Sequence, residues 1–450
     1  MNKSVRDLIR RYDFLSGHHK IVDGSERYAG LVTANGNRTT AVQRWFHAKE
    51  AFSVRLLEEV VADLDISLKG RLRVLDPFCG TGTSLLSAQR LAKARSDLSV
   101  SVCGIERNPF LHFVARTKAG WHTCDADRFE RLADSLTAKA TKTTDIDLPP
   151  LSTLRRRAVF EPAVVRRLLA LRQAIRSVRG PERNLLMMGL AGVFEVVSGV
   201  RKDGRALRIE PSKQRPRLRD ALKRAWEAIL EDLEAARSWY KPIRANVVLG
   251  DGRHLDGMSR AGPFDLLIYS PPYLNNIDYS EVYKLELWLC GFVKTSRAFK
   301  ALRQSTLRSH PSIRFDAPVS LLRDERLALV TQTVDLMLAA LPEDPGHARG
   351  RAVFKPYFDD IYQSLQAQAS LLRPGGLIAC IVGNSLHGPR DDADSRVPVA
   401  TDLMVAEIGR SIGLKVREVR VARHLRRRAP HARHLRESIV VMQKHTRSAL

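Results

Sequence analysis

The stretch RLRVLDPFCGTGTS, residues 71–84, decides how this chain folds. Its apolar residues predict a short strand up to Phe78, and the glycines that follow predict a tight turn into a helix over 84–94. Gly80 and Gly82 lack a Cβ atom, so the backbone amides of this turn can approach a ligand closely. The N-terminus of the following helix adds a partial positive charge at the same place. The pattern therefore predicts either a generic strand–helix turn or a binding loop, and other motifs must decide between them.

Two acidic residues are predicted to lie at the ends of later strands. Glu106 lies near the end of the predicted strand 99–108, where a carboxylate can accept hydrogen bonds from both hydroxyls of a ribose. Asp251 follows a third predicted strand and precedes Gly252. Its carboxylate could accept a hydrogen bond from an adenine amino group, although a turn-forming Asp-Gly pair is an equally good interpretation. An exposed carboxylate at a strand end is the alternative for Glu106.

The order of the predicted elements indicates an α/β fold. The strand, helix and strand between residues 71 and 108 form a β-α-β unit, which begins a doubly wound parallel sheet. The strand pattern returns after residue 245, and FDLLIYSPPY at 264–273 contains a further buried strand. Residues 125–245 between these parts are helical in pattern. We therefore predict a Rossmann-like sheet with helices on both faces, interrupted by a largely helical basic insert.

The composition indicates a polyanionic partner. The chain has 74 Lys and Arg against 49 Asp and Glu, a formal net charge of +25. Such a surface favours nucleic acid because each phosphate contact releases condensed counterions, although a generally basic proteome would produce the same excess. The apolar stretch 185–200 is short for a membrane span and is broken by Glu195, so a membrane partner is not expected.

The cysteines and histidines indicate no metal site. The five cysteines show no CxxC spacing, so neither a zinc site nor a disulfide framework is expected. His424, His431 and His434 lie among arginines, which would repel a metal ion. The N-terminal segment lacks the apolar core of a signal peptide. We expect a cytoplasmic location in association with the nucleoid.

Five segments of the chain resemble one enzyme family. DPFCGTGTS at 76–84 resembles the cofactor loop, often written DPFxGxGxx, of the amino-methyltransferases that modify DNA bases, and SPPY at 270–273 resembles their catalytic tetrapeptide. RWFHAKEAFS at 44–53 resembles the segment that covers the methionine end of the cofactor, although an ordinary amphipathic helix start would look the same. VGNSLHG at 382–388 and LRESIVV at 435–441 resemble late strands of such enzymes. The long insert between Glu106 and Asp251 departs from the family pattern.

The resemblance implies S-adenosyl-L-methionine as the cofactor. The residues expected to bind it come from the segment 44–53, from the loop 76–84 and from two later strand ends. They are Phe52, Ser53, Asp76, Pro77, Phe78, Gly80, Thr81, Gly82, Thr83, Glu106, Asp251 and Gly252. No metal is implied.

SPPY suits methyl transfer to an exocyclic amino group of a base. The lone pair of such a nitrogen is delocalised into the ring, so the nitrogen becomes nucleophilic only when acceptors hold its N–H groups. The Ser270 side chain and the Pro271 carbonyl can be those acceptors, and the two prolines hold the backbone rigid without amide donors. Tyr273 can stack on the target ring. A proline turn after a strand is the structural alternative for Pro271 and Pro272.

The serine of SPPY favours cytosine. Within the resembling family, DPPY and NPPY usually accompany methylation of adenine N6, and SPPY usually accompanies methylation of cytosine N4. We therefore predict a site-specific DNA methyltransferase that acts on a flipped-out cytosine. Three alternatives remain: an adenine N6 enzyme, an RNA base methyltransferase, and a catalytically silent DNA-binding protein on the same scaffold. DNA is the expected partner, a separate restriction endonuclease is an option that the family raises, and the oligomeric state stays open.

The basic insert is predicted to contact the nucleic acid. Extruding a base costs a few kcal/mol, which phosphate contacts must offset. Three regions are basic enough: the insert, residues 294–308, and the arginines between 417 and 428. We favour the insert, although a solvated helical hairpin is its alternative. The candidate residues are Arg201, Lys202, Arg205, Arg208, Lys213, Arg215 and Arg217.

These motifs divide the chain into four predicted parts. Residues 1–40 are a polar N-terminal leader. Residues 41–124 are the cofactor-binding part of a catalytic domain, and 125–245 are the basic insert. Residues 246–450 are the SPPY part of the catalytic domain, with a variable segment over 290–350.

Overall fold

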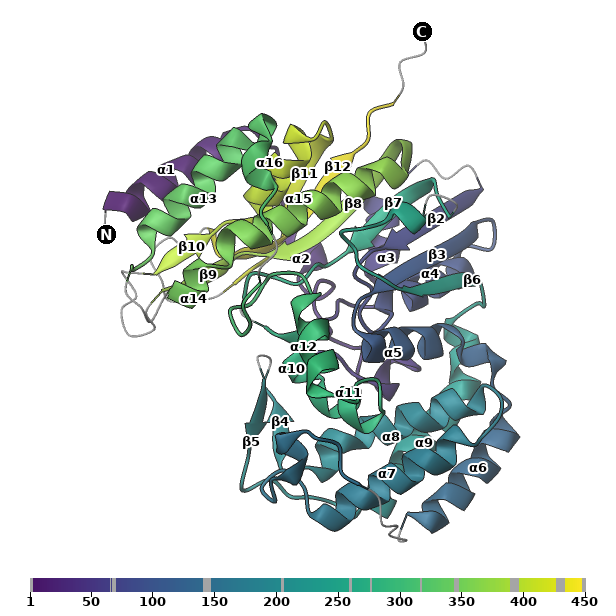
Figure 1. Ribbon diagram of the computed structural model, residues 1–450. Coiled ribbons are helices and arrows are strands. Elements are labelled where there is room, and N and C mark those ends of the chain that lie inside the picture. Colours follow the sequence, from purple (N-terminus) through teal and green to yellow (C-terminus); the bar gives the residue numbers. More distant parts are fainter. Residues whose placement is uncertain are drawn as a thin grey trace.

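A computed structural model describes residues 3–64, 66, 70–140, 147–203, 206–258, 261–275, 277–315, 318–343, 348–388, 396–425 and 434–446. Within these residues an eight-stranded sheet forms the centre of the molecule (Figure 1). Its strands, in spatial order, are β1 (Ile21–Asp23), β11 (Lys415–His424), β12 (Arg436–Gln443), β8 (Leu372–Gly383), β7 (Phe264–Tyr269), β2 (Arg71–Asp76), β3 (Ser99–Glu106) and β6 (Arg244–Leu249).

The sheet is parallel except at one strand. β12 pairs antiparallel with both β8 and β11, whereas the pairs β8–β7, β7–β2, β2–β3, β3–β6 and β1–β11 are parallel. After β2, the chain adds β3 and then β6 on one side of β2. It then returns to add β7 on the other side of β2. This reversal is a topological switch point, beside which open α/β sheets bind their ligands at the carboxyl ends of the strands.

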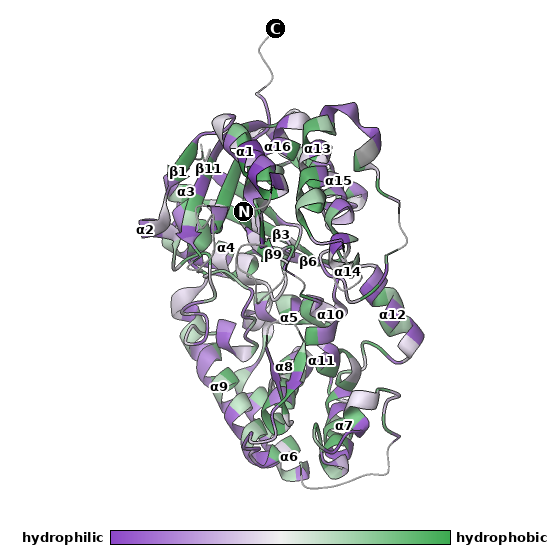
Figure 2. Ribbon diagram, turned by 90° about the vertical axis from the view of Figure 1, so that its left-hand side faces the viewer, coloured by the Kyte–Doolittle hydropathy of each residue, from purple (hydrophilic) through white to green (hydrophobic). Residues whose placement is uncertain are grey.

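Helices cover both faces of the sheet because its strands are apolar on both sides (Figure 2). Leu266 and Ile268 of β7 pack on one face, beneath α3 (Leu56–Asp63) and α4 (Thr83–Ala94). Leu267 and Tyr269 pack on the other face, which is covered by α13 (Ala328–Ala340), α15 (Phe354–Leu371) and α16 (Thr401–Ser411). The predicted Rossmann-like α/β fold is confirmed.

The N-terminal segment differs from the prediction of a polar leader. Residues Lys3–Gly17 form helix α1, which packs on α13 and α16, and β1 joins the edge of the central sheet. Val5, Leu8, Ile9, Tyr12 and Leu15 of α1 are buried. Their spacing of three and four residues is that of an amphipathic helix, and the abundant charged residues between them conceal it in the sequence.

The segment between β3 and β6 is mainly helical. It contains α5 (Pro109–Ala119), α6 (Ala126–Lys139), α7 (Pro162–Arg176), α8 (Glu182–Val197) and α9 (Leu218–Trp239). α6 to α9 form a bundle with a core of its own, which continues onto α5 and onto α11 (Lys284–Leu289). A short hairpin of β4 (Val200–Lys202) and β5 (Leu207–Ile209) connects α8 to the residues before α9.

The remaining short elements follow β7. α10 (Tyr279–Val282) and α12 (Ser296–Gln304) lie between the sheet and the bundle (Figure 1). β9 (Ser385–His387) and β10 (Val397–Val399) form a two-stranded sheet, and α2 (Ser25–Tyr28) and α14 (Ala348–Arg351) are single turns. Among the described residues, no helix is long and apolar enough to cross a membrane. The division of the chain at residues 40, 124 and 245 stays a prediction.

Candidate active site

One cavity lies at the carboxyl ends of the central strands. It gathers residues after β2, β3, β6 and β7, which are far apart in the sequence, together with residues of the segment 48–52. The predicted site residues that line it are Phe52, Asp76, Pro77, Phe78, Gly80, Thr81, Thr83, Glu106, Asp251, Gly252, Ser270 and Pro272. The structure thus brings the cofactor loop and the serine of SPPY to one place. The roles of the individual residues stay predictions.

Four predicted residues lie outside this lining. Ser53 is buried, and its hydroxyl accepts a hydrogen bond from the Arg55 amide at 3.4 Å. Gly82 adopts a left-handed conformation, with φ of 86°, at the start of α4. A Cβ atom there would lie 2.9 Å from the Cα atom of Ala115, so Gly82 allows α4 to pack closely on α5. Pro271 and Tyr273 line an adjoining cavity that shares Ser270 with the first one.

The cofactor turn is built around Asp76 and Gly80. Asp76 is buried at the end of β2, and its carboxylate accepts a hydrogen bond from the Phe78 amide at 2.9 Å. Burial raises the pKa of Asp76 to about 7, against the opposing effect of its hydrogen bonds. Gly80 has φ of 52°, and nothing lies within 4 Å of the position of a Cβ atom. The turn therefore leaves open space beside its backbone.

Glu106 is held by this turn. Its carboxylate accepts hydrogen bonds from the amide of Gly80 at 2.9 Å and from that of Asn108 at 2.7 Å. Burial raises the pKa of Glu106 to about 7 despite these amides. A carboxylate oxygen has two lone pairs, so each oxygen of Glu106 can accept one more hydrogen bond from a ligand in the cavity. Two ribose hydroxyls fit this pair of acceptors.

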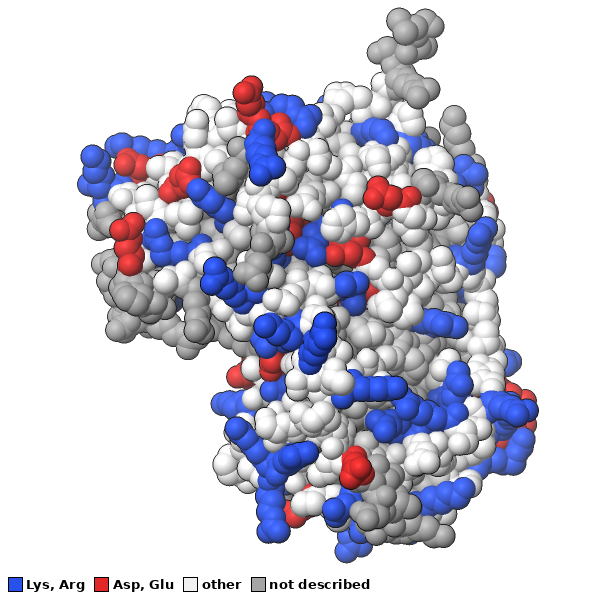
Figure 3. Space-filling view, in the orientation of Figure 1, with Lys and Arg blue, Asp and Glu red and all other residues white. Residues whose placement is uncertain are grey.

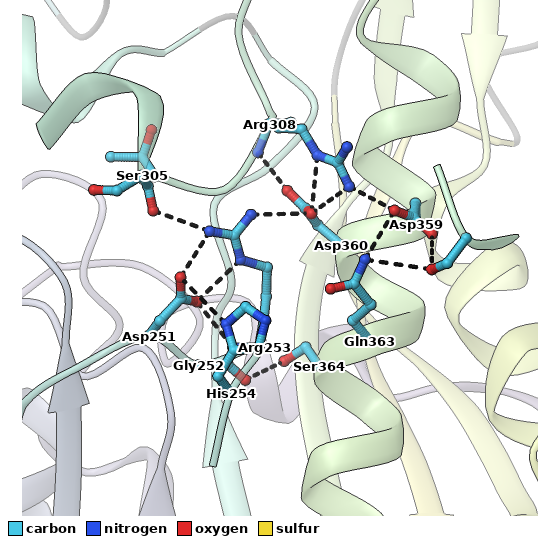
Figure 4. Close-up of polar contacts among 12 residues, drawn as sticks. Asp251, Gly252, Arg253, His254, Ser305, Arg308, Asp359, Asp360, Gln363 and Ser364 are labelled. Atoms are coloured by element: carbon cyan, nitrogen blue, oxygen red, sulfur yellow. Dashed lines mark hydrogen bonds and ion pairs between the residues drawn. The ribbon is translucent and has the colours of Figure 1, made fainter. Parts of the chain in front are cut away.

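Asp251 is less available than the sequence predicts (Figure 4). Its Oδ1 accepts from both the amide and the Nε of Arg253 at 3.0 Å, and its Oδ2 accepts from Nη2 of the same arginine at 2.7 Å. Burial acts to raise the pKa of Asp251, but these bonds and the charge of Arg253 together lower it. After these hydrogen bonds, one lone pair of Oδ2 remains available to a ligand.

Arg253 connects this carboxylate to a segment that no sequence motif indicated. It donates to the carbonyl of Ser305 at 3.0 Å and to the carboxylate of Asp360 in α15 at 3.0 Å. Buried Arg308 pairs with Asp359 and Asp360 beside it. Residues 305–307 are held by this network and line the cavity. They lie in the segment 290–350, where the sequence has neither a strand pattern nor a glycine turn to reveal them.

Other lining residues surround the point where the cavities meet. Glu50 lines the cofactor cavity, the adjoining SPPY cavity and a third cavity beside the insert. Burial raises its pKa, while Lys202 and Lys49 act against this rise. Tyr279 and Tyr283 also line the cofactor cavity. Their spacing of four residues directly after SPPY is the signal that could have revealed them.

The predicted cations of the insert divide into two groups. Arg208 and Arg217 are exposed, as is Arg215, which donates to the Ala158 carbonyl at 2.8 Å. Arg201 is also exposed and pairs with Glu210. Arg205 lies outside the described residues. In the orientation of Figure 3, Lys and Arg outnumber acidic side chains over the helical bundle.

Lys202 and Lys213 point inward instead. The Lys202 ammonium contacts buried Glu286 at 2.5 Å and lies 4.8 Å from the centre of the Tyr283 ring. Lys213 donates to the carbonyls of Glu195 and Val200 at 2.5 and 2.6 Å. A lysine satisfied by internal acceptors has fewer donors for phosphate. Lys202 therefore joins the insert to α11, and Lys213 holds parts of the insert to each other.

The residues of the cavity fit S-adenosyl-L-methionine. The lining is apolar at Phe52, Phe78, Ile105, Leu111 and Leu307, which suits an adenine ring and a methionine chain. Glu106 supplies two acceptors for a ribose, and the open backbone at Gly80 allows close approach. A parallel sheet with one antiparallel strand, with this cavity at its switch point, has the features of the Rossmann-like methyltransferases.

Comparisons with known proteins agree with this class. The chain is 24% identical over 317 residues to the Type II methyltransferase M.BsoBI of Geobacillus stearothermophilus, covering 64% of this chain and 60% of that protein. It is 26% identical over 308 residues to the Type II methyltransferase M.AvaI of Nostoc sp., covering 62% and 59%. The chain thus spans about three fifths of the length of these curated relatives. The resemblance to the amino-methyltransferases is confirmed, and S-adenosyl-L-methionine is the cofactor expected from it.

Solved structures are less similar. The rRNA methyltransferase aviRa of Streptomyces viridochromogenes aligns with 93% of this chain and 95% of its own at 14% identity, with a TM-score of 0.33. TrmN of Thermus thermophilus aligns with 86% and 48% at 13% identity, with a TM-score of 0.28. Similarity at this level does not transfer residue roles. No family model matches the chain.

Proposed function

We propose that this protein transfers a methyl group from S-adenosyl-L-methionine to the exocyclic N4 of a cytosine in DNA. One observation carries the proposal: Ser270 and Pro272 of SPPY line the same cavity as Gly80 and Glu106 of the cofactor turn. A base that contacts Ser270 would therefore lie next to a cofactor held by Glu106. The similarity to Type II methyltransferases supports DNA as the substrate.

Alignment of the amino group supplies most of the catalysis. When bound, S-adenosyl-L-methionine supplies a methyl group on a sulfonium, which is already a good leaving group. Ser270 Oγ and the Pro271 carbonyl accept hydrogen bonds from the two N–H groups, which directs the nitrogen lone pair toward the methyl. The amine becomes acidic as it is methylated, so a strong general base is not needed. Pro271 and Pro272 keep the loop rigid and free of competing amide donors.

The target base must leave the helix to reach this site. A stacked base is inaccessible to a cavity at the end of a sheet, so the enzyme acts on a flipped base or on a single strand. We propose that exposed arginines of the insert, among them Arg208 and Arg217, bind phosphates and offset the cost of extrusion. Such contacts position the DNA without specifying its sequence.

Nucleoside mass spectrometry tests the proposal. Purified protein is incubated with unmethylated genomic DNA and isotopically labelled S-adenosyl-L-methionine, and the digested nucleosides are separated. We expect label in N4-methylcytosine. Label in N6-methyladenine would keep the enzyme class and change the base. Label only in a parallel RNA sample would move the substrate to RNA, and binding of DNA without any label would identify a silent scaffold.

A further inference from the structure

We propose that Tyr273, Glu437 and Arg423 are positioning residues that orient the hydroxyl of Ser270 so that its oxygen accepts a hydrogen bond from the target amino group. The inference rests on the proposed function and deepens it. It assigns a role to the late-strand motif LRESIVV, which contains Glu437. It also gives Tyr273 a positioning role in place of the expected stacking on the target base.

A continuous chain of contacts connects these residues. Ser270 Oγ lies 3.0 Å from the hydroxyl oxygen of Tyr273, and that oxygen lies 2.7 Å from Oε1 of Glu437. The other carboxylate oxygen of Glu437 lies 2.5 Å from Nε of Arg423. This series of contacts begins in the cofactor cavity, because Ser270 lines it, and ends in the adjoining cavity, which Arg423 and Glu437 line.

The number of available hydrogen atoms allows this series of hydrogen bonds only one direction of donation. Arg423 can only donate, and an ionised Glu437 can only accept. Tyr273 has a single hydroxyl hydrogen, which therefore points to Glu437, and its oxygen is left to accept from Ser270. The single hydrogen of Ser270 is then directed toward Tyr273. Both Oγ lone pairs consequently point away from Tyr273, and they are the acceptors that a target N–H group requires.

The electrostatic surroundings keep every proton in place. Glu437 is almost completely buried, with a side chain 5% exposed, and Arg423 faces it directly as its partner on the neighbouring antiparallel strand. Nε of Arg423 donates a charge-assisted hydrogen bond to this carboxylate at 2.5 Å. Burial, together with the charge of Glu437, raises the pKa of Tyr273 well above its ordinary value, so the phenol keeps its proton.

Packing fixes the tyrosine ring in this position. Gly383 ends β8 and pairs in register with Glu437 of β12. A Cβ atom on Gly383 would lie 2.8 and 3.0 Å from two carbon atoms of the Tyr273 ring. The ring thus lies directly on the backbone of β8, and its hydroxyl reaches the next strand. A ring held in this way keeps its hydroxyl within hydrogen-bond distance of Ser270.

Tyr273→Phe is the sharpest test, because phenylalanine keeps the ring and removes only the hydroxyl. If the chain orients Ser270, kcat for methyl transfer to DNA falls about 10-fold, the loss expected for about 1.4 kcal/mol, while KM for S-adenosyl-L-methionine is unchanged. Tyr12→Phe is the matched control, since Tyr12 is also buried and donates to the Pro398 carbonyl at 3.0 Å, away from both cavities. It should leave kcat unchanged.

Variants of Glu437 separate orientation from folding. Glu437→Gln keeps an acceptor oxygen for Tyr273, so we expect it to retain more activity than Glu437→Leu, which keeps none. Wild-type kcat in Tyr273→Phe, or equal kcat in the two Glu437 variants, would overturn the inference and leave the proposed function intact. A wild-type protein that labels no nucleic acid in the same assay would instead overturn the proposed function, and this inference with it.

Discussion

The cofactor cavity and the adjoining SPPY cavity form two ends of one site, and each end holds a carboxylate in a different way. At the cofactor end, which we define as residues 76–83 with Glu106, two backbone amides hold the carboxylate, and their residues are 26 and 2 positions away from it in the sequence. At the base end, which we define as residues 270–273 with Glu437, the carboxylate binds an arginine from a neighbouring strand and a tyrosine 164 positions away. The first arrangement is a property of one β-α-β unit. The second exists only when four strands lie side by side.

This difference implies that methyl transfer and cofactor binding can be lost independently of each other. A local turn keeps its shape when a distant strand is perturbed, so damage to the base end should stop transfer and spare cofactor binding. Damage to the cofactor end should weaken cofactor binding first. The predictions below test this separation, beginning with the largest expected effect.

Replacing Ser270, Pro271, Pro272 and Tyr273 together by alanine should reduce methyl transfer at least about 100-fold, because the amino group loses its acceptors and its rigid support. Affinity for S-adenosyl-L-methionine should remain nearly that of the wild type. Isotope transfer to DNA and calorimetric titration of the cofactor measure the two quantities. Loss of both in a variant that still folds would show that the two ends are not separate.

Glu106→Gln should weaken cofactor binding about 10-fold, because a charged acceptor for the ribose hydroxyls becomes a neutral one. Asp251→Asn is the informative comparison, since Arg253 already occupies most of the acceptor capacity of Asp251. We expect it to weaken binding less and to lower the melting temperature by on the order of 2 °C as the network of Arg253 loosens. Equal loss of affinity in both variants would contradict the geometry of Figure 4.

The cofactor end should also produce a pH dependence. Burial raises the pKa of Asp76 and Glu106 to about 7, above the values of about 3.9 and 4.3 in an unfolded chain. A carboxyl group whose pKa is raised by folding stabilises the fold fully when the pH is below its pKa in the unfolded chain. This contribution is lost as the pH rises through its pKa in the folded protein, about 7. The cofactor-free protein should therefore lose stability between pH 5 and pH 8, while cofactor affinity rises as the acceptors ionise.

Glu106→Gln separates this effect from the titration of other groups. Its melting temperature should fall less between pH 5 and pH 8 than that of the wild type, because one of the two raised carboxyl groups is gone. Thermal unfolding in both proteins measures the difference. Parallel curves would show that Glu106 has an ordinary pKa in the folded protein.

The smallest effect is expected outside both ends. Changing Arg208, Arg215 and Arg217 to serine should weaken DNA binding about 5-fold. Each lost phosphate contact should reduce the slope of log K against log salt concentration by about 1. Cofactor affinity should not change. Lys202→Met is the contrasting variant, since its ammonium binds Glu286 inside the protein and not at the surface.

Filter binding over a range of salt concentrations distinguishes the two kinds of variant. Lys202→Met should lower the melting temperature, because it leaves a buried carboxylate unpaired, and should keep the wild-type salt slope. An unchanged slope in the arginine variant would remove the insert from the DNA interface.

The contrast between the two ends explains how much of the site could be predicted. Glu106 and the turn at Gly80 could be found in the sequence because strand, turn and strand follow one another within about one β-α-β unit. The SPPY loop could be found because consecutive prolines after an apolar strand are rare and chemically informative. Helix α1 was missed because its apolar stripe is diluted by charged residues, although its spacing is helical.

The amino-acid order alone determines the α/β fold, the position of the cofactor turn and the serine at the base end, since each depends on neighbouring residues and local backbone geometry. Only the tertiary structure decides that Arg253 beside Asp251 also binds Asp360 of α15, that Lys202 points inward, and that Glu437 lies beside Tyr273. These contacts join residues that are far apart in the sequence. Their existence depends on the order in which strands assemble in the sheet, which no local pattern records.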